Sequence, residues 1–360
     1  MARATTKNVA SNGDGTDEKN MGFVLRRTSN GEIKPLQSII SNTGNLLVWV
    51  GGFYMYPLIL WAFYFGFYKT GAVALAFTIC GLRLYVGHIK WITDFFFAGS
   101  FYMSKNSSIN FEDDSFLKEG STPTILAVHP HGCYSIGYRV VFICPEWEAS
   151  VRPIAKVLST ALMNQPIASF IFRHGSVTSC YKSDKNTFRE LLESKKHVSL
   201  LPGGFEEATI TSTTADRACT DKTGFVYYAL KYGYSLTPVY CFNEKRGYHN
   251  LQGFWNFRLW LASYGLPTIA CVGKWWAPWL PLTLFEDEGV HVVHGKPLPC
   301  PTITTPGKPT KQEVEAYRAR YEVALGDLYF RNAPKFYKEG TYDPELEIWP
   351  RDCPDYRKSE

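Results

Sequence analysis

The sequence predicts an α/β domain, a sheet with helices on both faces, preceded by a membrane-embedded hairpin. From about residue 90 onward, short apolar runs alternate with amphipathic segments, which indicates strands alternating with helices. Before that point lies a long uncharged segment rich in aromatic side chains, which favours a membrane location over a soluble core. We therefore divide the chain into a cytosolic tail at 1–40, a hairpin at 41–90, a main domain at 91–345 and a C-terminal tail at 346–360.

The N-terminal tail is polar as far as about Asn20 and has no apolar core. It is therefore not a secretory signal peptide, and we expect it to be disordered. The hairpin begins with Leu46–Tyr68, a stretch without a charged side chain, and about 20 such residues span a bilayer. Lys69 and Thr70 interrupt it, and Gly71–Leu82 forms a second, shorter apolar stretch.

Three arrangements fit this region: a hairpin that enters and leaves on one side, one span followed by an interfacial helix, or a buried core helix. We favour the hairpin. Basic residues flank it on both sides, and the positive-inside tendency then places both flanks in the cytosol. The flanking residues are Arg26, Arg27, Lys34, Arg83 and Lys90.

Charge and cysteine content exclude two classes of protein. The net charge of +5 is spread along the chain without a dense basic run, so we expect no nucleic-acid partner. The nine cysteines are odd in number and include no C-x-x-C pair, which indicates reduced thiols in a cytosol-facing domain.

The main domain contains several predicted elements. Strands are expected at 124–128, 176–180, 197–201, 235–242 and 290–294. Helices are expected at 158–172, 184–195, 223–232 and from 310 to about 329. Gly233 is a suitable C-cap for the third of these helices, and Thr310-x-x-Glu313 is a capping box that opens the fourth.

The first candidate site follows the strand at 124–128 and reads His129-Pro130-His131-Gly132. Residues two apart in an extended segment point to the same side, so both imidazoles are expected to face one space. Pro130 stiffens the turn, and Gly132 lets a ligand approach the backbone. Neutral imidazole is the usual proton acceptor near pH 7. A turn with two exposed histidines is the structural alternative.

The second candidate site follows the strand at 197–201 and contains Gly203, Gly204, Glu206 and Glu207. A Pro-Gly-Gly turn exposes backbone N–H groups that can hold an oxyanion or a phosphate. A carboxylate in it could orient a histidine. Both turns end strands, where α/β folds place their sites, so we expect them to share one pocket. A solvated acidic turn is the structural alternative.

A third segment, from Asp216 to Glu244, supplies two cations that could bind phosphates. Arg217 and Lys222 are candidates for the phosphates of a CoA-type donor, with solvated surface charges as the alternative.

Taken in order, the motifs resemble type-2 diacylglycerol acyltransferases, a family that includes monoacylglycerol and wax-alcohol acyltransferases. The resemblance covers roughly residues 40–345 and rests on His129–Gly132, Pro202-Gly203-Gly204-x-x-Glu207, the Gly224-to-Pro238 segment and His294-Gly295-Lys296-Pro297-Leu298. The sequence departs from the family at Asp94–Phe97, where a proline is missing, and at Tyr227, where a basic residue is usual.

The resemblance implies a glycerolipid-acyltransferase-like sheet and makes 91–345 the catalytic domain. It implies transfer of an acyl group from acyl-CoA to diacylglycerol, giving triacylglycerol, at the endoplasmic reticulum membrane or lipid droplets. Acyl-CoA is then a co-substrate, and no cofactor or metal is implied. Functional positions carried over are His129, Pro130, His131, Gly132, Gly203, Gly204 and Glu207. The sequence does not indicate the oligomeric state.

In the mechanism we expect, His131 or else His129 removes the proton from the acceptor hydroxyl, and Glu207 supports the histidine. Backbone N–H groups near Gly132 or Gly203–Gly204 would stabilise the oxyanion. A covalent variant would instead place the acyl group on Cys133.

Rival interpretations belong to other classes. Ser135 could serve a hydrolase, although G-x-S-x-G is not matched. His129, His131, His291 and His294 could hold a metal, although no other ligand accompanies them closely. A non-catalytic lipid-droplet or membrane protein would need the hairpin alone.

Overall fold

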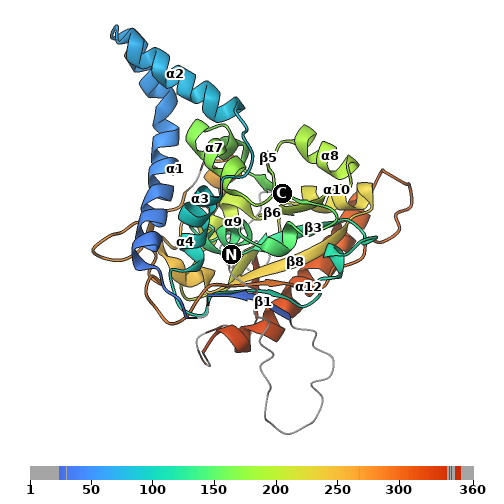
Figure 1. The fold of residues 1–360 in the computed structure, drawn as a ribbon. Helices are drawn as coiled ribbons and strands as arrows, with labels where there is room; N and C mark the ends of the chain where they lie inside the picture. The colour runs from blue at the N-terminus through green and yellow to red at the C-terminus, as the bar shows by residue number, and fades with distance from the viewer. Residues whose placement is uncertain are drawn as a thin grey trace.

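An eight-stranded mixed sheet forms the centre of the protein (Figure 1). The computed structural model describes residues 24–29, 31–266, 268–338, 340, 342 and 345–349. The tail predicted to be disordered, up to Asn20, lies outside these residues. In spatial order the strands are β1 (Val24–Thr28), β2 (Ser108–Phe111), β11 (His291–His294), β8 (Ser235–Phe242), β3 (Thr124–His129), β6 (His197–Leu200), β4 (Ile154–Leu158) and β5 (Cys180–Lys182).

Strand direction places several loops at one edge of the sheet. From β8 through β3, β6 and β4 to β5, every neighbouring pair is parallel. The pairs β1–β2 and β11–β8 are antiparallel, and β11–β2 is parallel. Because β3 and β6 are adjacent and parallel, the turns that follow them emerge at the same edge, as the sequence predicts.

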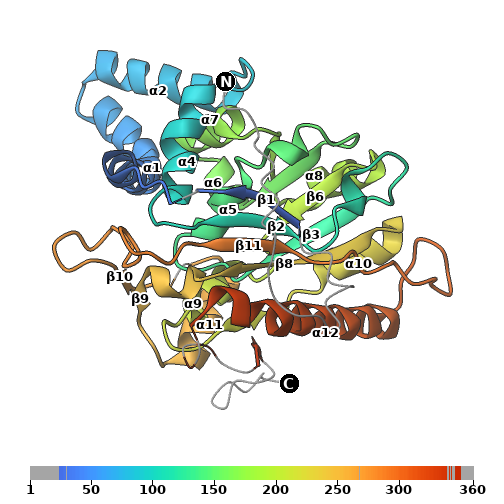
Figure 2. The ribbon, with the colours of Figure 1, turned by 60° about the horizontal axis from the view of Figure 1, so that its bottom comes forward.

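Alternating residues of β3 face two separate layers of helices. Ile125 and Ala127 pack in the core formed with α8 (Lys185–Glu193), α10 (Gly224–Tyr232) and α12 (Lys311–Phe336). Leu126 and Val128 pack in the opposite core, formed with α4 (Ala98–Phe101), α5 (Ile136–Val141) and α7 (Pro166–Gly175). Figure 2 shows α12 below the sheet and α4, α5 and α7 above it. The expected α/β fold with both faces covered is confirmed.

The other elements complete the domain. They are α3 (Lys90–Ile92), α6 (Thr160–Met163), α9 (Gly204–Ile210), α11 (Trp255–Ser263), β7 (Arg217–Cys219), β9 (His249–Asn250), β10 (Cys271–Val272), β12 (Glu347–Trp349), a π-helical turn at Thr93–Phe97 and 3-10 turns at Ser115–Leu117, Pro145–Trp147 and Glu244–Gly247. Two small sheets pair β9 with β10 and β7 with β12. The strands β1 and β12 fall in segments that we predicted to be tails, and they pair with β2 and β7.

Local signals locate some elements well and others poorly. Thr310 and Glu313 form the expected capping box of α12, and Gly233 ends α10 in the left-handed conformation at φ 72°. The helix expected at 158–172 is split in two: Leu158 still belongs to β4, α6 covers Thr160–Met163, and Pro166 starts α7. The strand expected at 176–180 begins only at Cys180.

The predicted hairpin region forms two helices that pack against each other, α1 (Pro35–Tyr64) and α2 (Tyr68–Arg83), here called the α1–α2 pair. The turn between them falls at 65–67, before the charged Lys69 that we took as the interruption. In Figure 1 the pair rises from one side of the domain. None of the helices in the described ranges is at once long and apolar enough to cross a membrane.

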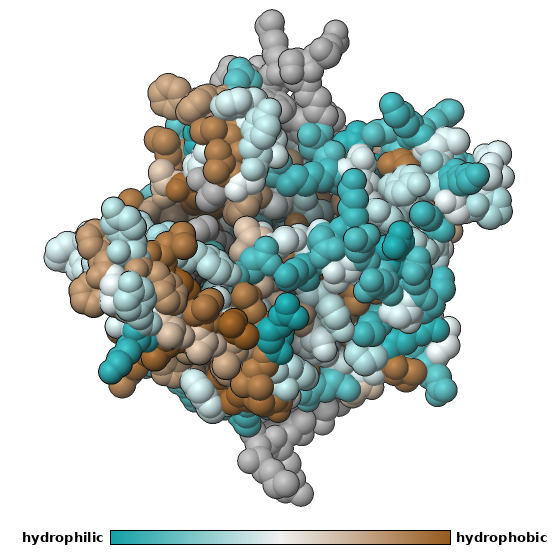
Figure 3. Space-filling view, turned by 90° about the horizontal axis from the view of Figure 1, so that it is seen from above, coloured by the Kyte–Doolittle hydropathy of each residue, from teal (hydrophilic) through white to brown (hydrophobic). Residues whose placement is uncertain are grey.

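Small residues join the α1–α2 pair to the domain. A side chain at Gly99 would meet Ser41 Cβ at 2.5 Å, and one at Gly81 would meet the Pro166 carbonyl oxygen at 2.7 Å. Farther from these contacts the pair exposes large apolar side chains, and Figure 3 shows hydrophobic residues gathered on this side of the molecule. They include Leu58, Leu60, Trp61, Tyr64, Phe65, Phe67, Val73, Phe77 and Ile79.

Candidate active site

The two predicted turns meet through one buried carboxylate. Glu207, on α9, is fully buried and accepts a hydrogen bond from His129 Nδ1 at 2.5 Å. The Cys219 N–H donates to the same oxygen at 2.8 Å, and the other oxygen accepts from the His131 backbone N–H at 2.8 Å. Glu207 thus ties the turn after β3 to the turn after β6.

Glycines make this close approach possible. A side chain at Gly203 would meet Glu207 Cβ at 2.5 Å, and one at Gly132 would meet Glu244 Oε1 at 2.1 Å. Gly132 and Gly204 also have positive φ, at 64° and 55°, a conformation that other residues adopt only with strain. Pro130 joins the two histidines through a cis peptide bond.

The two histidines occupy different environments. His129 is fully buried beside Glu207, and its Nε2 has no hydrogen-bond partner among the described residues. His131 instead lines a cavity, and its Nδ1 lies 2.8 Å from the Gly132 carbonyl oxygen. An Nδ1–H that donates to this carbonyl leaves Nε2 as the basic nitrogen. Burial lowers the pKa of His131 below its ordinary value of 6.5, so the ring is neutral near pH 7.

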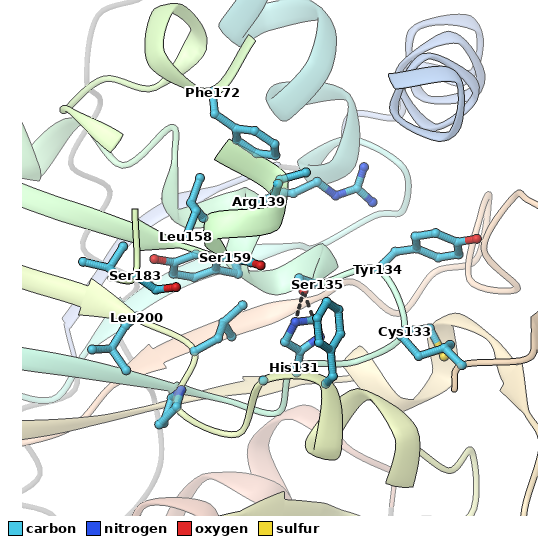
Figure 4. Close-up of a pocket in the computed structure, with 18 of the residues that line it drawn as sticks. His131, Cys133, Tyr134, Ser135, Arg139, Leu158, Ser159, Phe172, Ser183 and Leu200 are labelled. Atoms are coloured by element: carbon cyan, nitrogen blue, oxygen red, sulfur yellow. Dashed lines mark hydrogen bonds between the residues drawn. The ribbon is translucent and has the colours of Figure 1, made fainter. Parts of the chain in front are cut away.

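The cavity has a volume of about 650 Å³ and collects residues from both helical layers (Figure 4). Its lining is mainly apolar and aromatic, as expected of a site for an oily ligand. The apolar residues include Val157, Leu158, Leu162, Phe172, Phe188, Leu200, Leu201, Phe205, Phe225 and Ile269. Asn42, Asn45 and Leu46 of α1 also line it, so the α1–α2 pair forms part of its wall. Trp279 adds to this wall and donates to Thr43 Oγ1 at 3.0 Å.

The two candidate phosphate-binding cations lie in different places. Lys222 lines the cavity together with Gly204, and it pairs with Glu206 at 2.6 Å. Arg217 is not part of the lining: it pairs with Glu347 at 2.7 Å and stacks on Trp349. Lys185, which we did not single out in the sequence, lines the cavity as well.

Three further polar residues lie at the site: Ser135, which we considered only for a rival hydrolase, and Arg139 and Glu244, to which we assigned no role. Ser135 Oγ lies 3.1 Å from His131 Nδ1 and 3.4 Å from its Nε2. Arg139, one turn further along α5, lines the cavity. Glu244 accepts from the Ile136 N–H at 2.9 Å, and burial raises its pKa to about 7. Arg139 belongs to α5, which begins directly after the turn that carries His131 and Ser135, so a basic residue this close to the motif is the signal that could have indicated it.

The residues behind the rival interpretations have other contacts. His291 Nδ1 lies 2.7 Å from Ser108 Oγ, and His294 Nδ1 lies 3.1 Å from the Asn110 carbonyl oxygen, both within the sheet. The described part of the chain contains no cluster of three or more potential metal ligands. Cys133 lies beside Cys271 at the cavity wall, and burial and this neighbour raise the pKa of the Cys133 thiol, which disfavours the thiolate.

The sequence was compared with models of known protein families. The family model described as Diacylglycerol acyltransferase matches residues 102–347, more than half of the chain. The chain belongs to the diacylglycerol acyltransferase family. The matched range of this family member contains the His129–Gly132 turn, the Gly203–Gly204 turn and Lys222.

Curated relatives of this diacylglycerol acyltransferase family member share low identity with it. Diacylglycerol O-acyltransferase 2 of Bos taurus is 24% identical over 229 residues, 59% of this chain and 61% of the relative. Diacylglycerol O-acyltransferase 2-like protein 6 of Mus musculus is 27% identical over 246 residues, 62% of this chain and 69% of the relative. The chain thus spans less than two thirds of the bovine relative. No solved structure matches it.

Proposed function

We propose that this protein is an acyl-CoA:diacylglycerol O-acyltransferase that makes triacylglycerol. The observation that carries the proposal is a neutral histidine, His131, in the wall of a largely apolar cavity that also contains the glycine-rich turn and Lys222. Family membership supports the reaction class and the acceptor. Monoacylglycerol and a long-chain alcohol are the alternative acceptors.

In the proposed reaction His131 Nε2 takes the proton from the acceptor hydroxyl, and the oxygen attacks the thioester carbon of acyl-CoA. The C–S bond then breaks, and CoA leaves as a thiol after receiving a proton. Backbone N–H groups of Gly132 or of the Gly203–Gly204 turn stabilise the oxyanion, each worth roughly 3–4 kcal/mol in comparable enzymes. Glu207 accepts hydrogen bonds from the His131 backbone and the His129 ring, so Glu207 and His129 act in positioning the base.

Positive charge in the cavity lining supports binding of the acyl donor there. Lys185 and Lys222 line the cavity, and their ammonium groups suit the phosphates of CoA. Arg217 does not line the cavity, so we assign the phosphates to the two lysines. The acyl chain would occupy the apolar part of the cavity.

The α1–α2 pair is proposed to embed in a bilayer. Its exposed side chains are aromatic and aliphatic, which suits a lipid interface, and Asn42 and Leu46 of α1 line the cavity. We place the protein in the endoplasmic reticulum membrane, with its catalytic domain at 91–345 facing the cytosol and access to lipid droplets. The domain division given above is part of this proposal.

Expression of the full chain in cells that lack neutral-lipid synthesis tests the proposal. We expect triacylglycerol to accumulate in lipid extracts, and the protein to stay with the membrane pellet after an alkaline wash. Wax ester in place of triacylglycerol would shift the acceptor to a long-chain alcohol. The absence of any new neutral lipid would remove the enzymatic proposal and leave a non-catalytic membrane protein.

One contact favours a second mechanism. Ser135 Oγ reaches both nitrogens of His131, so the serine itself could accept the acyl group before it passes to the lipid or to water. In direct transfer, the serine is not acylated. Its hydroxyl only marks the place beside His131 that the acceptor hydroxyl takes when the lipid binds.

Substitution of Ser135 by alanine separates these routes. With direct transfer, we expect Ser135→Ala to retain activity within about threefold, because the hydroxyl is not consumed. With an acyl-serine route, activity should fall by at least about 100-fold, since the nucleophile is lost. Initial rates with radiolabelled acyl-CoA decide the matter, and Cys133→Ala measured alongside tests the other nucleophile.

A further inference from the structure

Arg139 is a buried cation in the cavity with unused hydrogen-bonding capacity. Its side chain extends from α5, only 7% of the residue is exposed, and it lines the cavity. Its Nη2 donates to Asn42 Oδ1 of α1 at 3.1 Å. Its Nε has no hydrogen-bond partner in the described part of the chain. In Figure 4 the Arg139 side chain extends toward α1, above His131 and Ser135.

An unsatisfied guanidinium in such a place is costly. The group carries five N–H donors, and leaving buried donors unpaired costs roughly 1–3 kcal/mol each. The neighbouring buried carboxylate, Glu244, is already used by the backbone N–H groups of Ile136 and Gly137. The remaining donors of Arg139 therefore need an acceptor that enters with a ligand.

The helix places these donors close to the reaction centre. Ser135 is the N-cap residue of α5, and the Arg139 backbone N–H donates to its carbonyl oxygen at 3.0 Å. Both residues line the cavity. Ser135 in turn contacts His131. A group bound by Arg139 and a hydroxyl beside His131 therefore lie in the same cavity.

We propose that Arg139 binds an ester carbonyl oxygen of the glyceride acceptor and so selects acylglycerols over lipid alcohols that lack an ester. This inference rests on the proposed function and names the feature of the acceptor that the site recognises. The ester of diacylglycerol is linked through the glycerol backbone to the free hydroxyl, which matches the arrangement of Arg139 and His131. The guanidinium acts here as a specificity residue and takes no part in proton transfer.

The surroundings favour a carbonyl over a phosphate. The side-chain amide of Asn45 donates to the main-chain oxygens of Ser41 and Phe96, and that of Asn42 donates to Ser38, so both are engaged with the main chain. The lysine Lys185 follows Ser183 by two residues, and Figure 4 shows Ser183 on the opposite side of the cavity from Arg139. A neutral carbonyl oxygen needs only one N–H donor, and the unpaired Arg139 Nε–H supplies it.

The test compares two acceptors of the same shape: a 1,2-diacylglycerol and a 1,2-dialkylglycerol, in which ether oxygens replace the esters. The wild-type protein should prefer the diacyl acceptor by about 10- to 100-fold in kcat/KM, as expected for a hydrogen bond from a charged group. In Arg139→Met we expect this preference to fall to about one, mainly through a higher KM for diacylglycerol. Arg139→Lys should retain part of it, because charge remains but the fork of donors is lost.

The controls make each result decisive. Arg189→Met removes an exposed cation from α8 and should leave the acceptor ratio unchanged. Equal losses on both acceptors in Arg139→Met, or a wild-type ratio near one, would overturn the inference and leave acyl transfer intact. Faster transfer to lysophosphatidate than to diacylglycerol would also overturn it, in favour of a phosphate. A wild-type protein that acylates none of these lipids would instead refute the proposed function.

Discussion

Replacing His131 by alanine should lower acyl transfer by about 100- to 10,000-fold, the range expected when a general base is removed. The imidazole lines the cavity, and its Nδ1 faces the Gly132 carbonyl oxygen, which directs Nε2 to the acceptor hydroxyl. The protein should still fold, because the contact of His131 with Glu207 uses its backbone N–H and survives the substitution. The measurements are initial rates on purified protein in mixed micelles and thermal unfolding of the same samples.

His249→Ala is the matched control, since His249 is exposed and belongs to β9. It should keep wild-type activity. The pH profile gives a second readout of His131. Because burial lowers the pKa of His131 below 6.5, its basic form persists as the pH falls, and kcat/KM should decline only below about pH 6.5. Activity of His131→Ala within threefold of the wild type would exclude His131 as the base.

Replacing Glu207 by alanine is expected to destabilise the protein by roughly 3–5 kcal/mol, the range found when one partner of a buried polar pair is removed. Three donors would lose their acceptor: the His129 ring, the His131 N–H and the Cys219 N–H. For a domain of this size such a loss lowers Tm by about 5–8 °C. Activity should fall as well, because the turn that carries His131 is no longer fixed.

Glu207→Gln refines this prediction. An amide can accept from His129 and Cys219 with its oxygen, but its NH2 group then faces the His131 N–H, and two donors repel. We expect a smaller loss of Tm than in Glu207→Ala and a clear loss of kcat. Glu190→Gln on the exposed face of α8 is the control for a carboxylate-to-amide change and should alter neither quantity. If Glu207→Ala unfolds at the wild-type Tm, the buried carboxylate does not stabilise the fold.

Much of the fold could be read from local patterns because those patterns are set by local physics. The apolar strand β8 coincides with the predicted range 235–242, and the capping box at Thr310 correctly started α12. β4 was missed because Lys156 interrupts its apolar run. In the structure Lys156 is fully buried, donates to Ser176 and Thr178, and packs against Phe142 and Trp147. These partners are distant in sequence, so no local window indicates that a lysine belongs in the core.

The sequence alone predicted the turns at His129–Gly132 and Gly203–Glu207 and their meeting in one pocket. It could do so because parallel strands end at a common edge of a sheet. Only the tertiary structure separated His129, buried on Glu207, from His131 in the cavity wall. It also showed that Arg217 lies outside the cavity lining, whereas Ser135 and Arg139 belong to it. The reason is physical: spacing along the chain determines which face a side chain takes, whereas packing between layers determines which buried groups meet and which reach an open space.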